Sequence, residues 1–111
     1  MVAAPEQGAL VKLSFDPTQG HEQKGYRPAL IVSHTRFNQR TGFCWAVPIT
    51  SHVKGLPNEC LLPEGLAVHG ALLLSQLRAL DWTARPFTVV DRVHATFLED
   101  INARLKAVLE V

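Results

Sequence analysis

Polar side chains suited to binding an oxyanion stand at the ends of apolar segments. Arg27 directly precedes the apolar segment 28–32, and Thr50 and Ser51 directly follow the segment 43–49. A guanidinium is planar, always charged and able to bind two phosphate oxygens at once. A hydroxyl held at the end of a rigid strand can donate a hydrogen bond to a similar oxygen. Each residue alone is ordinary, because an arginine at a strand end is usually solvated and a threonine there usually caps a turn.

A second set of candidates lies farther along the chain and in two loops. Gln76 and Arg78 interrupt the otherwise apolar segment 68–80, and Arg85 follows Trp82. Small β-folds place their function in the loops at strand ends. The loops 20–25 and 51–57 add His21, Glu22, His52 and Lys54 to the candidates.

Most standard constellations are absent from the sequence. It contains neither G-x-x-x-x-G-K nor G-x-G-x-x-G, so a nucleotide-phosphate cradle is not predicted. The five histidines are scattered, with no C-x-x-C or H-x-x-H pair, and we expect no metal site and no cofactor. No serine stands in a G-x-S-x-G elbow, although a triad assembled only by tertiary folding stays open.

The hydropathy pattern predicts short strands. Residues 9–15 alternate, with Val11, Leu13 and Phe15 on one face, and residues 28–32 are apolar throughout, as in a strand covered on both sides. We expect the remaining strands at 43–49, at 59–62, at 68–80 in bent or split form, and at 87–90. Residues 33–42 are a polar excursion with one helical turn, and residues 52–58 are a loop.

One substantial helix is predicted, at the C-terminus. Thr96 and Glu99 form a T-x-x-E capping box, after which apolar residues recur at spacings of three and four. Five to seven short strands followed by a helix favour a strongly coiled sheet or a small barrel. The predicted class is therefore mostly β (α+β), as one domain over residues 1–111.

The net charge of +1 conceals an uneven distribution. Residues 23–58 contain no Asp or Glu and carry +5, while the rest of the chain carries −4. If this is more than chance clustering, Arg27, Thr50 and Lys54 share one face of the fold, and that face is cationic. The 7% aromatic content leaves few stacking surfaces, of which Tyr26 and Phe15 are the candidates.

The sequence predicts a cytoplasmic protein. The first seven residues are too short and polar for a signal peptide, and no apolar stretch approaches the ~20 residues of a membrane span. The two cysteines are too few for a disulfide scaffold. Cys44 lies in an apolar run, and we expect it, like Cys60, to be a reduced core residue.

Three strings resemble the signatures of MazF/PemK-type toxins of bacterial toxin–antitoxin pairs. The first is G-H-E-Q-K-G-Y-R-P-A-L at 20–30, preceded by F-D-P at 15–17. The second is V-P-I-T-S at 47–51 with K-G-L-P at 54–57, and the third is Q-L-R-A-L-D-W-T-A-R at 76–85. Their order and gaps agree over essentially the whole chain. One departure is Ser75, where several relatives carry an acidic residue.

The resemblance implies an SH3-like, CcdB/MazF-like small β-barrel that forms a homodimer and cleaves single-stranded RNA without a metal. It places the family's catalytic arginine on Arg27, its threonine on Thr50, its loop glutamate on Glu22 and its glutamine on Gln76. It implies a MazE-like antitoxin as the partner, with neither a membrane nor directly bound DNA. Phe15, Asp16, Ser51, Lys54, Gln76, Arg78 and Arg85 are the residues expected to contact the substrate.

The residues suit this chemistry, because RNA carries its own nucleophile. Attack by the 2′-hydroxyl on the adjacent phosphorus gives a 2′,3′-cyclic phosphate, and Arg27 and Thr50 are suited to stabilising the phosphorane. Arginine is a poor general base at neutral pH, so the proton carrier is either His21 or Glu22. Two alternatives stay open: a CcdB-like inhibitor of DNA gyrase, and a non-catalytic SH3-like binding module.

Overall fold

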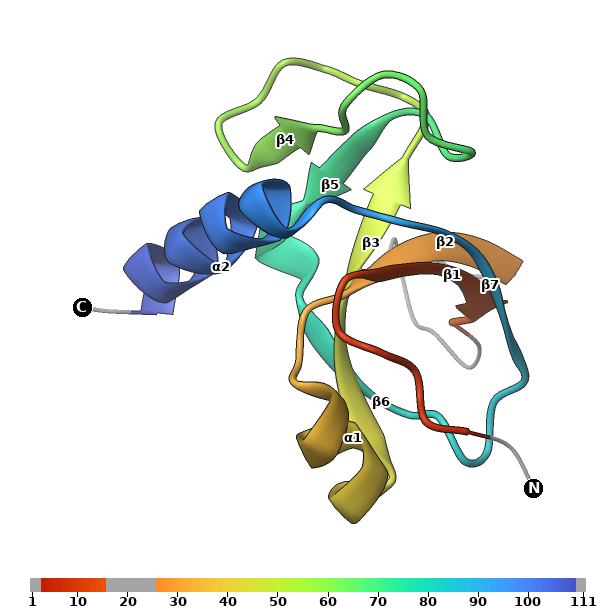
Figure 1. Cartoon of the computed structure of the whole chain (residues 1–111). Coiled ribbons are helices and arrows are strands. Elements are labelled where there is room, and N and C mark those ends of the chain that lie inside the picture. Colours follow the sequence, from red (N-terminus) through yellow and green to blue (C-terminus); the bar gives the residue numbers. More distant parts are fainter. Residues whose placement is uncertain (1–2, 16–25, 110–111) are drawn as a thin grey trace.

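The computed structural model describes residues 3–15 and 26–109, which form a coiled sheet with one long helix against it (Figure 1). The elements in chain order are β1 (Ala9–Ser14), β2 (Tyr26–Ile31), α1 (Thr35–Thr41), β3 (Phe43–Thr50), β4 (Glu59–Leu61), β5 (Ala71–Leu73), the 3-10 turn η1 (Leu74–Gln76), β6 (Arg78–Asp81), β7 (Phe87–Arg92) and α2 (Ala95–Leu109).

The long strand β3 organises the sheet. The strand order is β4-β5-β3-β2-β1-β7, and β6 pairs with β3 outside this path. All the pairings are antiparallel. One edge of β3 is thus shared by β6 near its start and β5 near its end. Figure 1 shows α1 at the start of β3 and the β4–β5 hairpin near its end.

Alternation along the strands divides the buried apolar residues into two clusters. In β1, Val11 and Leu13 face a core inside the curled sheet, whereas Leu10 faces a second core against α2. In β3, Ala46 belongs to the first core and Val47 to the second. Because successive side chains in a strand point to opposite faces, strands apolar on both faces must be covered twice, as predicted for 28–32.

A buried amide fixes the connection between β2 and β3. Asn38 of α1 is fully buried, and its Nδ2 donates to the carbonyl of Pro5 at 2.9 Å. Its own carbonyl accepts from the Trp82 indole N–H at 2.8 Å and from the Gly42 N–H at 3.1 Å. These bonds tie the N-terminal segment, α1 and the end of β6 together, which holds both strands that flank α1.

Most predicted elements are confirmed, including the split of 68–80 into β5, η1 and β6. The single helical turn predicted in 33–42 is instead the seven-residue helix α1, which begins where the His34 Nδ1 accepts from the Arg36 N–H. The predicted capping box is wrong, because α2 begins at Ala95 and its first bond runs from the Leu98 N–H to the His94 carbonyl. Thr96 therefore lies inside the first turn.

Among the cysteines, Cys44 is buried as predicted and burial raises the pKa of its thiol to about 11. Cys60 is only half-buried, so the prediction of a second core cysteine is confirmed in part.

Candidate functional site

The pairing of β2 with β3 brings Arg27 and Thr50 together. Ala29 lies opposite Pro48, and Ile31 lies opposite Ala46. Continuing this register by two residues places Arg27 opposite Thr50. Arg27 lies on the same face of β2 as Ala29 and Ile31, which pack into the inner core. Thr50 lies on the same face of β3 as Ala46, which packs into that core too. Both side chains therefore point to the same face of the sheet, at the same end. Directly opposed residues on one face have Cβ atoms roughly 4.5–5.5 Å apart, so an arginine and a threonine in these positions can bind the same phosphate group.

The hydroxyl of Thr50 is oriented by the backbone that follows it. Its Oγ1 accepts a hydrogen bond from the His52 N–H at 3.1 Å, which leaves the hydroxyl proton available to a ligand. The side chain is only 9% exposed, and Thr50 pairs with Ala71 of β5. A small, buried donor whose hydroxyl is oriented by a backbone N–H is suited to binding one oxygen in a fixed position.

The end of β1 gathers three arginines from distant parts of the chain. Arg27 lies opposite Leu13 in the β1–β2 ladder. The Arg85 Nη1 donates to the carbonyl of Ser14 at 2.8 Å, and the Arg78 Cζ lies 5.5 Å from the centroid of the Phe15 ring. These three contacts fall on consecutive residues of β1 and the position after it. They create a cationic end of the sheet, which is the arrangement expected around a phosphate backbone.

The prediction that the Phe15 ring offers a stacking surface is wrong. Its side chain is fully buried in the inner core, so the ring has no free face on which a base can stack. It instead supports the Arg78 guanidinium through a cation–π contact. The other stacking candidate, Tyr26, is 55% exposed, and its hydroxyl is hydrogen-bonded to Thr88 Oγ1 at 3.1 Å.

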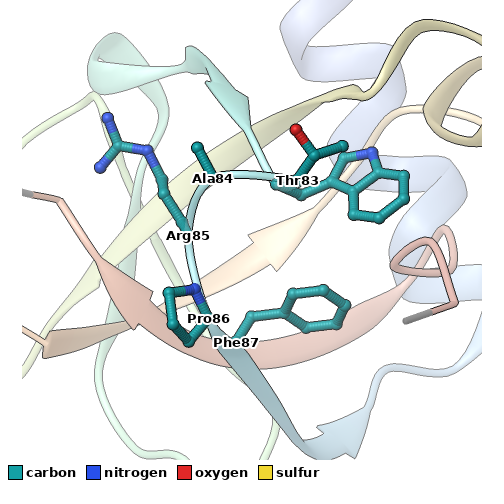
Figure 2. A pocket seen from close by; sticks show the side chains of 6 residues that line it. Thr83, Ala84, Arg85, Pro86 and Phe87 are labelled. Carbon is teal, nitrogen blue, oxygen red and sulfur yellow. The ribbon is translucent and has the colours of Figure 1, made fainter. Parts of the chain in front are cut away.

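The turn before β7 holds Arg85. Trp82 and Phe87 meet edge to face, with centroids 6.5 Å apart, and a concavity of about 680 Å³ is lined by residues 82–87. Figure 2 shows the Arg85 side chain on one side of this turn and the Phe87 ring on the other. The hydrogen bond from the Thr83 hydroxyl lowers the pKa of Asp81, which keeps that carboxylate ionised at the start of the turn. The aromatic pair and this hydrogen bond restrain the turn and so help to fix the position of Arg85.

The loop after Thr50 and the turn η1 carry the remaining candidates at the end of β3. Ser51 and Lys54 are exposed in the loop, and Gln76 is exposed at the end of η1. The Asn58 Nδ2 donates to Ser75 Oγ at 2.7 Å, so the loop is bound to the turn that carries Gln76. Ser75, the departure seen in the sequence, thus has a structural partner here.

The +5 segment is divided between the two ends of the sheet. Arg27 and Lys54 lie at the Thr50 end, whereas Arg36 and Arg40 lie on α1, at the start of β3 (Figure 1). Proximity of Arg27 to Thr50 follows from the register, but the whole segment does not form one cationic face. The predicted site residues Asp16, His21 and Glu22 lie outside the described residues.

Two residues with a part in this geometry were missed in the sequence. Gly70 packs its backbone against the carbonyl of Thr50, and Glu59 accepts hydrogen bonds from the loop that carries Lys54. Gly70 did interrupt an apolar segment, where an isolated glycine signals a close backbone approach. Glu59 gave no such signal, because its role depends on the conformation of a loop.

The described residues offer neither a metal-binding cluster nor a helix that could span a membrane. Over residues 3–15 and 26–109, no three His, Cys, Asp or Glu side chains are grouped as a metal site requires. In the same part of the chain, neither helix is long and apolar enough to cross a membrane.

Comparison with known proteins identifies the family. Residues 6–109 match the family model described as a PemK-like, MazF-like toxin of type II toxin-antitoxin systems. The endoribonuclease toxin MazF of Escherichia coli (strain K12) is 37% identical over 105 residues, covering 95% of this chain and 94% of that protein. The crystal structure of MazF from Deinococcus radiodurans (Form-I) superposes with a TM-score of 0.89 at 40% identity, covering 97% of this chain and 98% of that one.

A second solved structure, MazE–MazF from Deinococcus radiodurans (Form-II), gives a TM-score of 0.83 at 40% identity, with 96% of each chain covered. These likenesses confirm the predicted fold class, a mostly β MazF-like structure with a C-terminal helix. In the described part of the chain the sheet is barrel-like but not closed, since β7 pairs with β1 alone. The chain belongs to the PemK-like, MazF-like family of toxins of type II toxin–antitoxin systems.

Proposed function

We propose that this chain is the endoribonuclease toxin of a type II toxin–antitoxin pair, and that it cleaves single-stranded RNA without a metal ion. The endoribonuclease names of its relatives support the activity. The site assignment is supported by the β2–β3 register, which brings Arg27 across from Thr50 when it is continued by two residues. Arg78 and Arg85, which contact the end of β1, extend the cationic surface on which RNA is bound.

The reaction uses the nucleophile within the substrate. The RNA 2′-oxygen forms a bond to the adjacent phosphorus while the bond to the 5′-oxygen breaks, giving a 2′,3′-cyclic phosphate and a 5′-hydroxyl. Arg27 binds the non-bridging oxygens as negative charge accumulates in the phosphorane. Thr50 donates its hydroxyl proton to one of the same oxygens, while the His52 N–H keeps the hydroxyl oriented.

Two protons move in this step, one from the 2′-hydroxyl and one to the 5′-oxygen. His21 and Glu22 are the candidates from the sequence, and they stay alternatives. The unperturbed pKa of histidine, near ~6.5, suits proton transfer at neutral pH.

The remaining predicted contacts hold the RNA strand. Lys54, Arg78 and Arg85 bind phosphates beyond the scissile one, and Ser51 and Gln76 offer hydrogen bonds to the sugar or to base edges. A single strand is favoured because its unstacked bases expose these edges.

We also propose that the protein is a cytoplasmic homodimer inhibited by a MazE-like antitoxin. The solved complexes of relatives support an antitoxin partner. Exposed apolar side chains support self-association: Trp45 of β3 is 42% exposed on the side of the sheet that faces α2, and Leu109 is 69% exposed at the end of α2.

The direct test is to incubate the purified protein with a long RNA in EDTA. We expect discrete fragments that end in cyclic phosphate, and sequencing of the fragment ends gives the cleavage motif. Intact RNA, with the protein folded and free of antitoxin, would contradict the proposal. Inhibition of gyrase supercoiling without RNA cleavage would instead favour the CcdB-like alternative.

Arg27→Ala tests the site within the same assay. We expect cleavage to fall by about 10³-fold with the protein still folded, because Arg27 is the arginine assigned to the scissile phosphate, whereas Arg78 and Arg85 are assigned to neighbouring phosphates. Arg27→Lys keeps the charge but loses the planar guanidinium that binds two oxygens, so it should restore little of the cleavage activity. Arg40→Ala is the matched control, since it removes an exposed arginine of the same +5 segment from α1. Equal activity of Arg27→Ala and Arg40→Ala would show that the site is assigned wrongly.

A further inference from the structure

The carboxylate of Glu59 holds the loop that carries Lys54. Its Oε1 accepts from the Lys54 N–H at 2.9 Å, the Gly55 N–H at 2.7 Å and the Leu56 N–H at 3.2 Å. Its Oε2 accepts from the same backbone N–H of Lys54 at 3.3 Å. Three consecutive backbone N–H groups thus converge on one carboxylate, as in an anion-binding nest.

The backbone adds one further restraint, because the Glu59 N–H donates to the Leu56 carbonyl at 3.0 Å. Residues 51–57 are all exposed, so no buried side chain fixes the loop. Gly55 adopts a φ of +74°, which turns consecutive N–H groups toward one point. An exposed segment without apolar anchors depends on its hydrogen bonds for order. The Glu59 carboxylate therefore supplies the hydrogen bonds to Lys54 and Gly55, in the middle of the loop.

The two ends of the loop are fixed independently. Thr50 precedes it and is held by β5 and by the backbone of Gly70. Asn58 follows it, with its carbonyl accepting from the Leu74 N–H at 2.9 Å and its Nδ2 donating to Ser75. Loss of the Glu59 carboxylate should therefore release Lys54 without moving Thr50.

We propose that Glu59 is a positioning residue for RNA binding, which holds the Lys54 ammonium where it meets an RNA phosphate. The proposal rests on the proposed function and adds a specific role to an acidic residue within a cationic site. A carboxylate close to RNA ordinarily weakens binding by repulsion. Glu59 instead strengthens RNA binding, because its carboxylate accepts hydrogen bonds from the loop backbone and so positions Lys54.

The direction in which KM for RNA changes distinguishes a positioning role of Glu59 from an effect of its charge alone. If Glu59 acted through its charge alone, Glu59→Ala and Glu59→Gln would both lower the KM for RNA, by equal amounts. Under the proposal, Glu59→Ala raises KM by about tenfold with kcat within twofold of wild type. Glu59→Gln, which keeps an oxygen at the Oε1 position, raises KM by less. Glu64→Ala is the charge control, because Glu64 is exposed in the turn after β4.

The experiment measures steady-state cleavage of a short labelled RNA by these variants and by Lys54→Met. We expect Lys54→Met to raise KM to the level of Glu59→Ala, and the double variant to be no worse than either single one. Additive effects in the double variant, a lowered KM in Glu59→Ala, or a loss confined to kcat would each overturn the proposal.

Amide NMR of the free protein keeps this outcome distinct from failure of the proposed function. The wild-type amides of Lys54, Gly55 and Leu56 should be shifted downfield and exchange slowly, and Glu59→Ala should abolish both properties while Glu64→Ala preserves them. Ordered amides in a wild-type protein that cleaves no RNA would refute the proposed function and, with it, the role in RNA binding. Amides that are unchanged in Glu59→Ala would refute the positioning contact itself.

Discussion

Replacing Gly70 with alanine tests whether the position of Thr50 controls cleavage. Gly70 precedes β5 and has a φ of +130°, and a Cβ built there lies 2.1 Å from the carbonyl oxygen of Thr50 and 2.9 Å from its carbonyl carbon. A methyl group needs at least 3.0 Å, so the two strand ends must separate by about 1 Å. The displaced group is backbone and cannot rotate away.

The expected loss follows from that displacement. Misplacing a catalytic group by about 1 Å can cost roughly 10²-fold in rate. Removing a preorganised donor altogether costs about 10²–10³-fold. We therefore expect kcat to fall by about 10²-fold in Gly70→Ala. KM should change less, because the arginines proposed to bind the RNA lie on other elements.

Stability should fall as well, but not enough to unfold the protein. A non-glycine residue at an unfavourable positive φ costs about 1–3 kcal/mol. Domains of this size have about 5–15 kcal/mol of stability. The melting temperature should drop by roughly 4–8 °C for each kcal/mol lost.

Gly65→Ala supplies the matched control. Gly65 also has a positive φ, +90°, but nothing lies within 4 Å of a Cβ built there. Both variants should lose stability, and only Gly70→Ala should lose cleavage. The assay is the initial rate on a short labelled RNA in EDTA at 20 °C, with near-ultraviolet circular dichroism to confirm folding. A folded Gly70→Ala variant that cleaves within threefold of Gly65→Ala would refute the reasoning.

Two further predictions concern single side chains. Thr50→Val keeps the shape of the side chain but removes the hydroxyl, so kcat should fall by about 10²–10³-fold, while Thr50→Ser should retain most of it; single-turnover cleavage at saturating enzyme measures both. Burial raises the pKa of the Cys44 thiol from 9.0 to about 11, so the unfolded thiol ionises first and wild-type stability should decline as the pH rises from 9 toward 11. Urea midpoints across that range should decline less steeply in Cys44→Ala, and parallel declines would contradict the assigned burial.

Much of the secondary structure could be predicted because it is encoded locally. Alternation in residues 9–15 and the apolar run 28–32 report a period and a degree of burial that contiguous residues carry by themselves. Helix boundaries were less predictable. The T-x-x-E pattern is present at Thr96, yet α2 starts at Ala95, because a local cap competes with the tertiary packing of the whole helix.

The candidate site divides in the same way. Arg27 and Thr50 could be singled out from residue type, strand-end position and family resemblance. The burial of Phe15 could not, because it depends on the inner core closing around that ring. Nor could the split of the +5 segment, since the length of β3 separates Arg40 from Thr50.

Local residue patterns suffice to predict the kinds of elements, the family and the residues able to bind a phosphate. Which of these residues meet depends on the packing of distant segments. The β2–β3 register is set by two apolar cores, and continuing it by two residues brings Arg27 across from Thr50. A slip of one residue would turn one of the two side chains to the other face. Likewise, Gly70 acquires its role only where its backbone approaches that of Thr50. Periodicity belongs to neighbouring residues, whereas register and close approach are long-range properties of the packed chain.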